Sequence, residues 1–150
     1  MDNYKINLIG DKDDIPADVS IYSDDKGICY IELKHKSLII TAQDYDFFDA
    51  FCKIRKKLEK ESLIPFCYAA SLNHYPSSMS RSMGLGLKSY KRTLNEPCKE
   101  NPVNIFSSGV DVIPVYVENQ EKFHQDWVES IQNKKSFLSK LKGFFIKSNS

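Results

Sequence analysis

The sequence predicts an α+β protein in which a single mixed or antiparallel sheet of about five to six strands packs against three or four helices. Three observations support this fold class. Short β-rich runs alternate with turn signals up to residue 41, residues 47–58 carry a helical apolar stripe, and residues 64–72 are almost uninterruptedly apolar. The length of 150 residues and the 27% of charged residues fit one globular domain, which we assign to residues 1–150.

An antiparallel meander is predicted for the N-terminal part of the chain. Residues 4–9, 19–22, 28–33 and 37–41 are rich in apolar and β-branched side chains, and Gly, Asp and Lys separate them. Acidic side chains gather in the predicted turns, where solvation alone explains them. The alternative is a surface for a basic partner, and its candidate residues are Asp13, Asp14, Asp24 and Asp25.

A helix is predicted next, from a cap at Thr41 or Asp44 to about Glu61. Acids crowd its start and bases its second half, an order that suits the helix dipole, so the basic run needs no ligand to explain it. Its apolar stripe follows helical spacing and consists of Phe47, Phe51, Ile54 and Leu58.

Residues 64–94 hold a predicted central strand and the most constrained passage of the chain. Ile64–Leu72 has the composition of a strand buried on both faces, and a site would lie beyond its C-terminal end. Pro76 stops it, and Ser77 or Ser78 caps a helix that begins near Met79. This helix has a predicted core face of Met79, Met83, Leu87, Tyr90 and Leu94 and an opposite basic face of Arg81, Lys88 and Arg92.

Two alternatives stay open along this helix. Gly84 and Gly86 each cost roughly 1 kcal/mol in a helix interior, so they indicate either close backbone packing or a loop. The serines at its start, with Arg81, are either plain caps or a site for an anion or an acidic partner side chain. Ser89 stands where a nucleotide fingerprint needs its third glycine, so that motif is absent.

The C-terminal third of the chain is predicted to contain both strands and helices. Val103–Phe106 is predicted to form a short strand. Val110–Val117 is predicted to form an edge strand or an extended loop, because Pro114 splits this run. Glu118–Gln132 is predicted to form a helix with a core tryptophan. Residues 134–150 carry five lysines and no acid among Phe and Leu. Such a segment is compatible with lying on an anionic membrane, but we favour a basic helix that docks on the sheet or frays.

Charge and cysteine usage limit the classes of partner and the cellular compartment that the sequence favours. The formal net charge is +1, with −6 over residues 1–49 and +7 over residues 50–150, so we expect no nucleic-acid partner. The four cysteines form no C-x-x-C pair, which favours reduced thiols and a cytoplasmic location. No signal-peptide pattern and no apolar run of about 18 residues occur, so we expect no membrane insertion.

No motif in the chain names a reaction. His35, His74 and His124 fall in separate predicted elements, and no Cys/His spacing fits a zinc site, so we predict neither a metal nor a cofactor. Cys67 lies within an apolar run, where its thiolate is disfavoured, and serine-nucleophile motifs are absent. We therefore expect a protein that is not an enzyme.

Three passages resemble a known group of proteins. They are YPSSMSRSMGLGLKSYK, VNIFSSGVDVIPV and the Gln120–Trp127 helix, within roughly residues 64–131. They are similar to immunity proteins from bacterial polymorphic-toxin and contact-dependent-inhibition loci. The resemblance implies a single-domain α+β protein that binds one cognate toxin, such as a nuclease or another effector acting in the cytosol. Such a protein blocks the active site or partner surface of the toxin and has no catalytic residue to carry over.

Two function classes therefore follow. The first is a toxin inhibitor that binds through the acidic turns or through the basic residues Arg81, Lys88 and Arg92. The second is a small enzyme or ligand-binding domain with a site after residue 72, around His74, Ser78 and Arg81. The second class predicts a concave polar pocket at His74 and Arg81.

Overall fold

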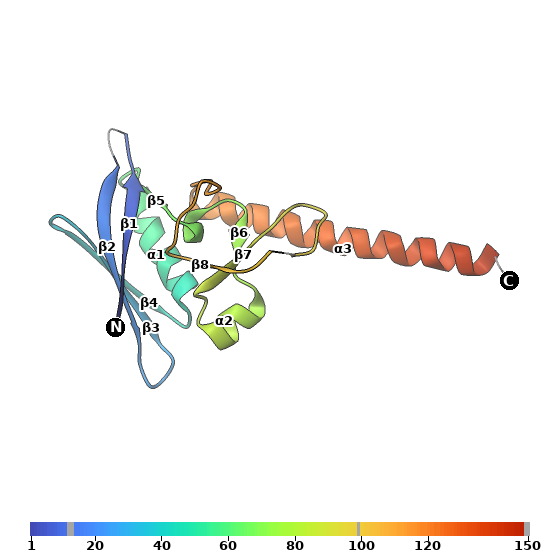
Figure 1. Cartoon of the computed structure of the whole chain (residues 1–150), viewed down its shortest axis with the longest axis horizontal. Helices are drawn as coiled ribbons and strands as arrows, with labels where there is room; N and C mark the ends of the chain where they lie inside the picture. The colour runs from blue at the N-terminus through green and yellow to red at the C-terminus, as the bar shows by residue number, and fades with distance from the viewer. Residues whose placement is uncertain (12–13, 99, 149–150) are drawn as a thin grey trace.

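The computed structural model describes residues 1–11, 14–98 and 100–148, and it confirms the α+β class. Within these residues the strands form two sheets, one of five strands and one of three, where the sequence predicted a single sheet. The same residues hold three α-helices and one short 3-10 helix. Figure 1 shows the crossed strands of the larger sheet at one end of the molecule and helix α3 running away from them toward the C-terminus.

The predicted N-terminal meander is confirmed. Its strands pair antiparallel in chain order, and a fifth strand joins the free edge of the first, so the order is β4-β3-β2-β1-β5. Alternate side chains of the meander point to one buried face, as the two-residue period of a strand requires. The strands are β1 (Asp2–Ile9), β2 (Ile15–Ser23), β3 (Cys29–His35), β4 (Leu38–Asp44) and β5 (Ile64–Phe66).

Helix α1 (Phe47–Glu59) covers the buried face of this sheet. Its predicted apolar stripe is confirmed, because all of the stripe residues are buried in the same apolar core as the strands. Arg55 departs from the rest of the basic run, since its side chain is only 1% exposed. The helix therefore meets the rest of the chain through a buried cation as well as through apolar contacts.

The apolar run 64–72 is not the central strand that the sequence predicts. Only Ile64–Phe66 is a strand, and it pairs with β1 at the edge of the sheet. Pro65 has no N–H to donate to a further strand, which suits an edge and not a centre. The 3-10 helix η1 (Tyr68–Ala70) follows, and two of its amides donate to carbonyls in residues 105–107. The run is apolar because it is buried, and burial alone does not distinguish a strand from other buried backbone.

The helix predicted from Met79 to Leu94 ends early: Gly84 is its last residue, and the alternative of a loop is confirmed at Gly86. Helix α2 spans Ser78–Gly84, and strand β7 (Lys88–Lys91) follows it. The break removes the predicted alignment of side chains. Met79 and Met83 are exposed and do not form a core face.

Left-handed backbone at Leu85 (φ 55°) and Gly86 (φ 71°) ends α2. The N–H groups of both residues donate to the Ser80 carbonyl, and the Leu85 carbonyl accepts the Phe47 N–H at 2.7 Å. A Cβ added to Gly86 would lie 2.9 Å from the Asp46 carboxylate. The second glycine is therefore required by a close approach to the start of α1.

The smaller antiparallel sheet has the order β6-β7-β8, with β6 at His74–Tyr75 and β8 at Val103–Asn104. The predicted short strand near residue 103 is thereby confirmed. Residues 110–116 form no strand apart from an isolated bridge between Ser71 and Pro114, which agrees with the extended-loop alternative.

Helix α3 (Val117–Ser148) joins two segments that the sequence treated separately. The predicted helix 118–132 is confirmed as its first half. The basic segment continues the same helix, and its described side chains from residue 132 to residue 144 are exposed. Docking on the sheet is therefore wrong, and Figure 1 shows this half of α3 projecting from the body of the protein.

A buried hydrogen-bond network around Arg55 ties α1 and α3 to the irregular middle of the chain. Arg55 Nη1 donates to the Ala69 carbonyl at 2.8 Å and to Gln120 Oε1 at 2.6 Å. Arg55 Nη2 donates to the Val115 carbonyl at 3.1 Å. Gln120 Nε2 donates in turn to three carbonyls within residues 69–74. These bonds satisfy buried backbone oxygens, so a charged side chain holds this segment in place.

Candidate functional site

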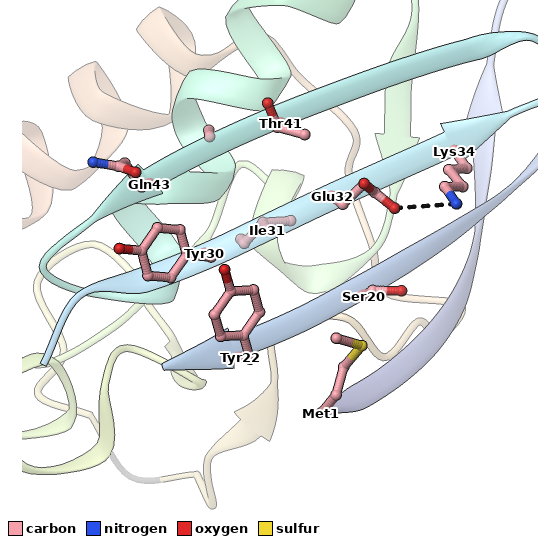
Figure 2. A pocket seen from close by; sticks show the side chains of 10 residues that line it. Met1, Ser20, Tyr22, Tyr30, Ile31, Glu32, Lys34, Thr41 and Gln43 are labelled. Carbon is pink, nitrogen blue, oxygen red and sulfur yellow. Dashed lines mark ion pairs between the residues drawn. The ribbon is translucent and has the colours of Figure 1, made fainter. Parts of the chain in front are cut away.

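Two surfaces carry side chains suited to recognition, and the first is the outward face of the larger sheet. Strand alternation points one set of side chains of β2, β3 and β4 away from α1, and Figure 2 shows them together. A cavity of about 540 Å³ opens on this face. We call it the outer sheet face, and it is lined by Met1, Ser20, Tyr22, Tyr30, Glu32, Lys34, Thr41 and Gln43, with Ile31 and Ala42 between them.

A stacked tyrosine pair is the main aromatic feature of the outer sheet face. Tyr22 and Tyr30 are cross-strand partners, and their ring centroids lie 4.7 Å apart with an angle of 10° between the planes. Tyr22 is 47% exposed despite its size. Tyrosine is enriched at protein interfaces because its ring buries a large area and its hydroxyl still forms hydrogen bonds.

Asp24, one of the predicted partner acids, fixes the turn beside this pair. Its carboxylate accepts the N–H groups of Lys26 and Ile28 at 2.9 Å and the Tyr30 hydroxyl at 3.1 Å. The Ile28 N–H bond is the main reason that the pKa of Asp24 lies below its usual value. Asp24 therefore orients Tyr30, and the exposed Asp25 follows it in the same turn.

The predicted acidic residues do not form one surface. Asp14 is exposed between β1 and β2, whereas Asp24 and Asp25 lie at the other end of β2. The strand between them has 9 residues, or roughly 30 Å of extended chain. Asp13 lies outside the described residues. Of these acids, Asp24 and Asp25 belong to the turn that contacts the tyrosine pair.

The second surface is a pocket of about 400 Å³ that we call the arginine pocket. A series of stacked contacts runs through it. The Arg81 guanidinium lies 5.1 Å from the centroid of the Tyr75 ring, and the Tyr75 ring stacks on His124 at 3.7 Å. His124 lies 6.2 Å from Trp127, and Arg92 lies 4.1 Å from the Trp127 ring. The lining contains no carboxylate and consists of Tyr75, Pro76, Ser77, Ser78, Arg81, Arg92, His124, Gln125, Trp127 and Val128.

Arg81 is held by the start of α1 and is not part of an exposed basic face. Its Nη1 donates to Asp46 at 3.1 Å and to Asp49 at 2.8 Å. Asp46 is the N-cap of α1, in place of the predicted Thr41 or Asp44, because its carboxylate accepts the Asp49 N–H at 2.7 Å. Burial raises the pKa of Asp46, and the Asp49 N–H and Arg81 offset part of that rise. Two carboxylates therefore already balance the charge of Arg81.

Arg92 is a buried cation that contacts no carboxylate in the described part of the chain. It is 7% exposed, its Nη1 lies 2.7 Å from Cys98 Sγ, and its Nε has no hydrogen-bond partner. His124 Nδ1 is also buried without a partner, and burial lowers the pKa of His124. Because unpaired buried donors cost free energy, this pocket is a place where an anion would be stabilised.

The remaining predicted residues lie elsewhere. His74 is buried against the Tyr68 ring, at 4.5 Å between centroids, and burial lowers the pKa of His74. Lys88 is exposed on β7, so it shares no helical face with the two arginines. A concave pocket is present at Ser78 and Arg81, as the ligand-binding alternative predicts, but His74 does not line it.

Sequence reasoning missed the tyrosine pair and the contribution of α3. Tyr22 and Tyr30 stand at outward positions of predicted strands, and two large aromatic residues at solvent positions are a usable signal. Trp127 is half-buried under Arg92 and is not the core anchor that the sequence predicted. No local pattern pairs Arg92 with a residue of α3, so that contact had no sequence signal.

Several other features bear on chemistry. Among the described residues no group of three or more His, Cys, Asp or Glu side chains is placed to hold a metal ion. No helix within the described ranges is long and apolar enough to cross a membrane. The four cysteines are unpaired, and burial raises the pKa of the Cys29, Cys52 and Cys67 thiols to about 11.

Comparison with known protein families and with curated proteins gives no match for this chain. The resemblance to immunity proteins therefore stays a prediction that rests on the passages quoted above.

Proposed function

We propose that this protein is a non-catalytic inhibitor that binds a partner protein through the outer sheet face, in the manner of an immunity protein that neutralises a bacterial toxin. The observation that carries the proposal is the stacked Tyr22–Tyr30 pair. Both rings line a cavity on the face of the sheet that points away from α1. Cross-strand aromatic pairs also stabilise a sheet. A pair used for stability alone needs no cavity lined by further hydrogen-bonding side chains.

The chemistry of the outer sheet face favours a protein as its partner. Uncharged donors and acceptors surround the tyrosines, and the two charged side chains of the lining, Glu32 and Lys34, pair with each other at 3.3 Å. A nearly neutral face with aromatic anchors is typical of protein interfaces, where a few Tyr, Trp or Arg residues supply most of the affinity. Asp24 and Asp25 add negative charge at one border, which favours a partner that is basic there.

Inhibition by this face needs no reaction. The tyrosine rings are stacked and the Tyr30 hydroxyl is held by Asp24, so little side-chain freedom is lost when a partner covers them. An interface of typical size, about 800 Å² on each partner, would extend beyond the cavity over neighbouring strands. A toxin bound in this way has its active site or its partner surface occluded.

The test is co-expression of the full chain with the product of each neighbouring gene that is toxic when expressed alone. We expect protection and a stable complex with one of them. The double variant Tyr22→Ala/Tyr30→Ala loses protection, whereas Tyr116→Ala keeps it, because Tyr116 is a 40% exposed tyrosine next to the start of α3 that does not line the cavity. Thermal unfolding of each variant verifies that the fold is intact. Full protection by the double variant, or no complex with any neighbour, would refute the proposal.

Binding of a small oxyanion in the arginine pocket is a second candidate function, and the observation that favours it is the buried Arg92 without a carboxylate. Charge-assisted hydrogen bonds contribute about 1.5–3 kcal/mol each, so we expect Arg92→Met to weaken sulfate binding at least about tenfold. Calorimetric titration with sulfate measures this effect. Lys88→Met is the control, because Lys88 is exposed outside the pocket. Equal sulfate affinity in both variants, or none in the parent chain, excludes this function.

A further inference from the structure

The distal half of α3 exposes large apolar side chains in a row. Four of them are between 36% and 66% exposed, although residues of this kind are usually buried: Phe137, Leu138, Leu141 and Phe144. This part of the helix projects from the body, as Figure 1 shows. None of these four side chains belongs to the apolar core of the described residues.

The exposed apolar residues occupy one face of the helix. At about 100° per residue they fall within an arc of roughly 120°. Lys135 and Lys142 follow one edge of this arc, and Lys140 follows the other edge. Lys134 precedes the apolar residues within the arc and donates to the Asn95 carbonyl at 3.0 Å. The opposite side of the helix carries small residues, Ser136, Ser139 and Gly143. The segment is therefore amphipathic, with cations on both borders of its apolar face.

The charge of this segment has one sign. The sequence contains no Asp or Glu after Glu129, whereas five lysines lie between residues 134 and 147. Two copies of such a helix would bring like charges together along their apolar faces, which disfavours self-association. An anionic surface with an apolar interior complements both features, because lysine stems lie along the apolar zone while their ammonium groups reach the negative headgroups.

We propose that the distal half of α3 lies on an anionic lipid surface, with its Phe and Leu face among the acyl chains and its lysines at the headgroups. This inference goes beyond the proposed function and rests on different residues. It places the helix parallel to the membrane plane, because Ser136, Ser139 and Gly143 form a polar side that stays in water. The outer sheet face remains free to bind a partner at that surface.

The test is co-sedimentation of the full chain with vesicles of phosphatidylcholine alone and with vesicles enriched in phosphatidylglycerol. We expect binding to the second kind only, with weaker binding as salt is raised. Phe137→Gln/Leu141→Gln weakens binding at least about tenfold, since it removes buried apolar area at constant charge. Lys140→Gln/Lys142→Gln weakens it roughly 25-fold, at about fivefold per lysine.

The matched control is Ser136→Gln/Ser139→Gln, which adds the same side chain to the opposite side of the helix and should bind within about twofold of the parent. All of these positions are exposed, so an unchanged thermal unfolding midpoint is expected in every variant. Equal binding to both vesicle types, no binding to either, or an unchanged affinity of the Phe137→Gln/Leu141→Gln variant overturns the proposal. A dimer of the full chain that the same variant dissociates, without vesicle binding, overturns it as well.

Discussion

The five-stranded sheet and the segment between β5 and α3 are held together in different ways. The sheet buries alternate apolar side chains against α1 and satisfies its backbone through regular ladders. The segment 67–116 has little regular structure and is held by three arginines that meet carbonyls, carboxylates or aromatic rings: Arg55, Arg81 and Arg92. Where apolar periodicity is absent, the planar Arg55 guanidinium fixes buried irregular backbone through two carbonyls, whereas Arg81 and Arg92 contact side chains.

The two candidate surfaces also differ in this way: one is built on regular strand pairing and the other on contacts of arginine side chains. The outer sheet face depends on strand register alone, so its tyrosines are in place once the sheet has formed. The arginine pocket depends on contacts between α2, α3 and the chain near Arg92, which are far apart in the sequence. Substitution of a buried arginine or of its support should therefore damage the second region more than the first.

The largest effect is expected for Arg55→Met. The substitution keeps apolar volume but leaves the Val115 carbonyl and the Gln120 amide oxygen without their Arg55 donor, and the Ala69 carbonyl keeps only its bond from Gln120 Nε2. We expect the free energy of unfolding to fall by about 3–5 kcal/mol, measured by urea denaturation. The neighbouring Lys56→Met, at an exposed position, should change it by less than about 0.5 kcal/mol. Similar losses in both variants would mean that the buried network contributes nothing.

The two glycines at the C-terminal end of α2 come next. Gly86→Ala forces a positive φ of 71° on a residue with a Cβ and places that Cβ 2.9 Å from the Asp46 carboxylate, so we expect a loss of about 1–3 kcal/mol. Gly84→Ala meets no atom closer than Ser80 Oγ at 3.9 Å and should leave stability unchanged or raise it by up to about 1 kcal/mol. Denaturation of the two variants side by side checks this, and equal losses would place both glycines in the same environment.

A smaller effect is expected from pH. Burial lowers the pKa of His74 and of His124, so in the unfolded chain both take up a proton near their ordinary value of 6.5, before they do so in the folded protein. Their contribution to stability is therefore present above about pH 6.5 and is lost as the pH falls below it. The free energy of unfolding should decrease between about pH 7.5 and pH 5.5. His124→Phe, which keeps a stacked ring, should reduce that slope, and an unchanged slope would contradict the burial of His124.

The sequence predicted the regions whose side-chain period repeats along the whole element. The meander, α1 and the first half of α3 all have such a period. The edge position of β5 and the end of α2 could not be predicted in this way, because they depend on tertiary contacts. The amides after Phe66 pair with residues 105–107, and Gly86 packs against Asp46.

The candidate surfaces divide in the same way, into features that follow from strand alternation and features that depend on tertiary contacts. Alternation places Tyr22 and Tyr30 on the outward face, although the cavity beside them depends on how the strands are arranged in three dimensions. Arg81 and Arg92 were predicted on an exposed basic face because a cation is normally solvated. Carboxylates and aromatic rings from other elements half-bury Arg81, and Arg92 is buried against Trp127, so Lys88 alone of that predicted set stays exposed on the described surface.

The most direct test of the account is the affinity of the proposed toxin partner for two variants of the full chain, measured by calorimetry. Tyr22→Ala/Tyr30→Ala should weaken binding about thirtyfold or more, because truncation of an interface hot spot costs about 2 kcal/mol or more. Arg92→Met should leave the affinity within about threefold of the parent, because Arg92 is buried away from the outer sheet face. A partner that tolerates the tyrosine substitutions and is lost with Arg92→Met would contradict the account and place recognition in the arginine pocket.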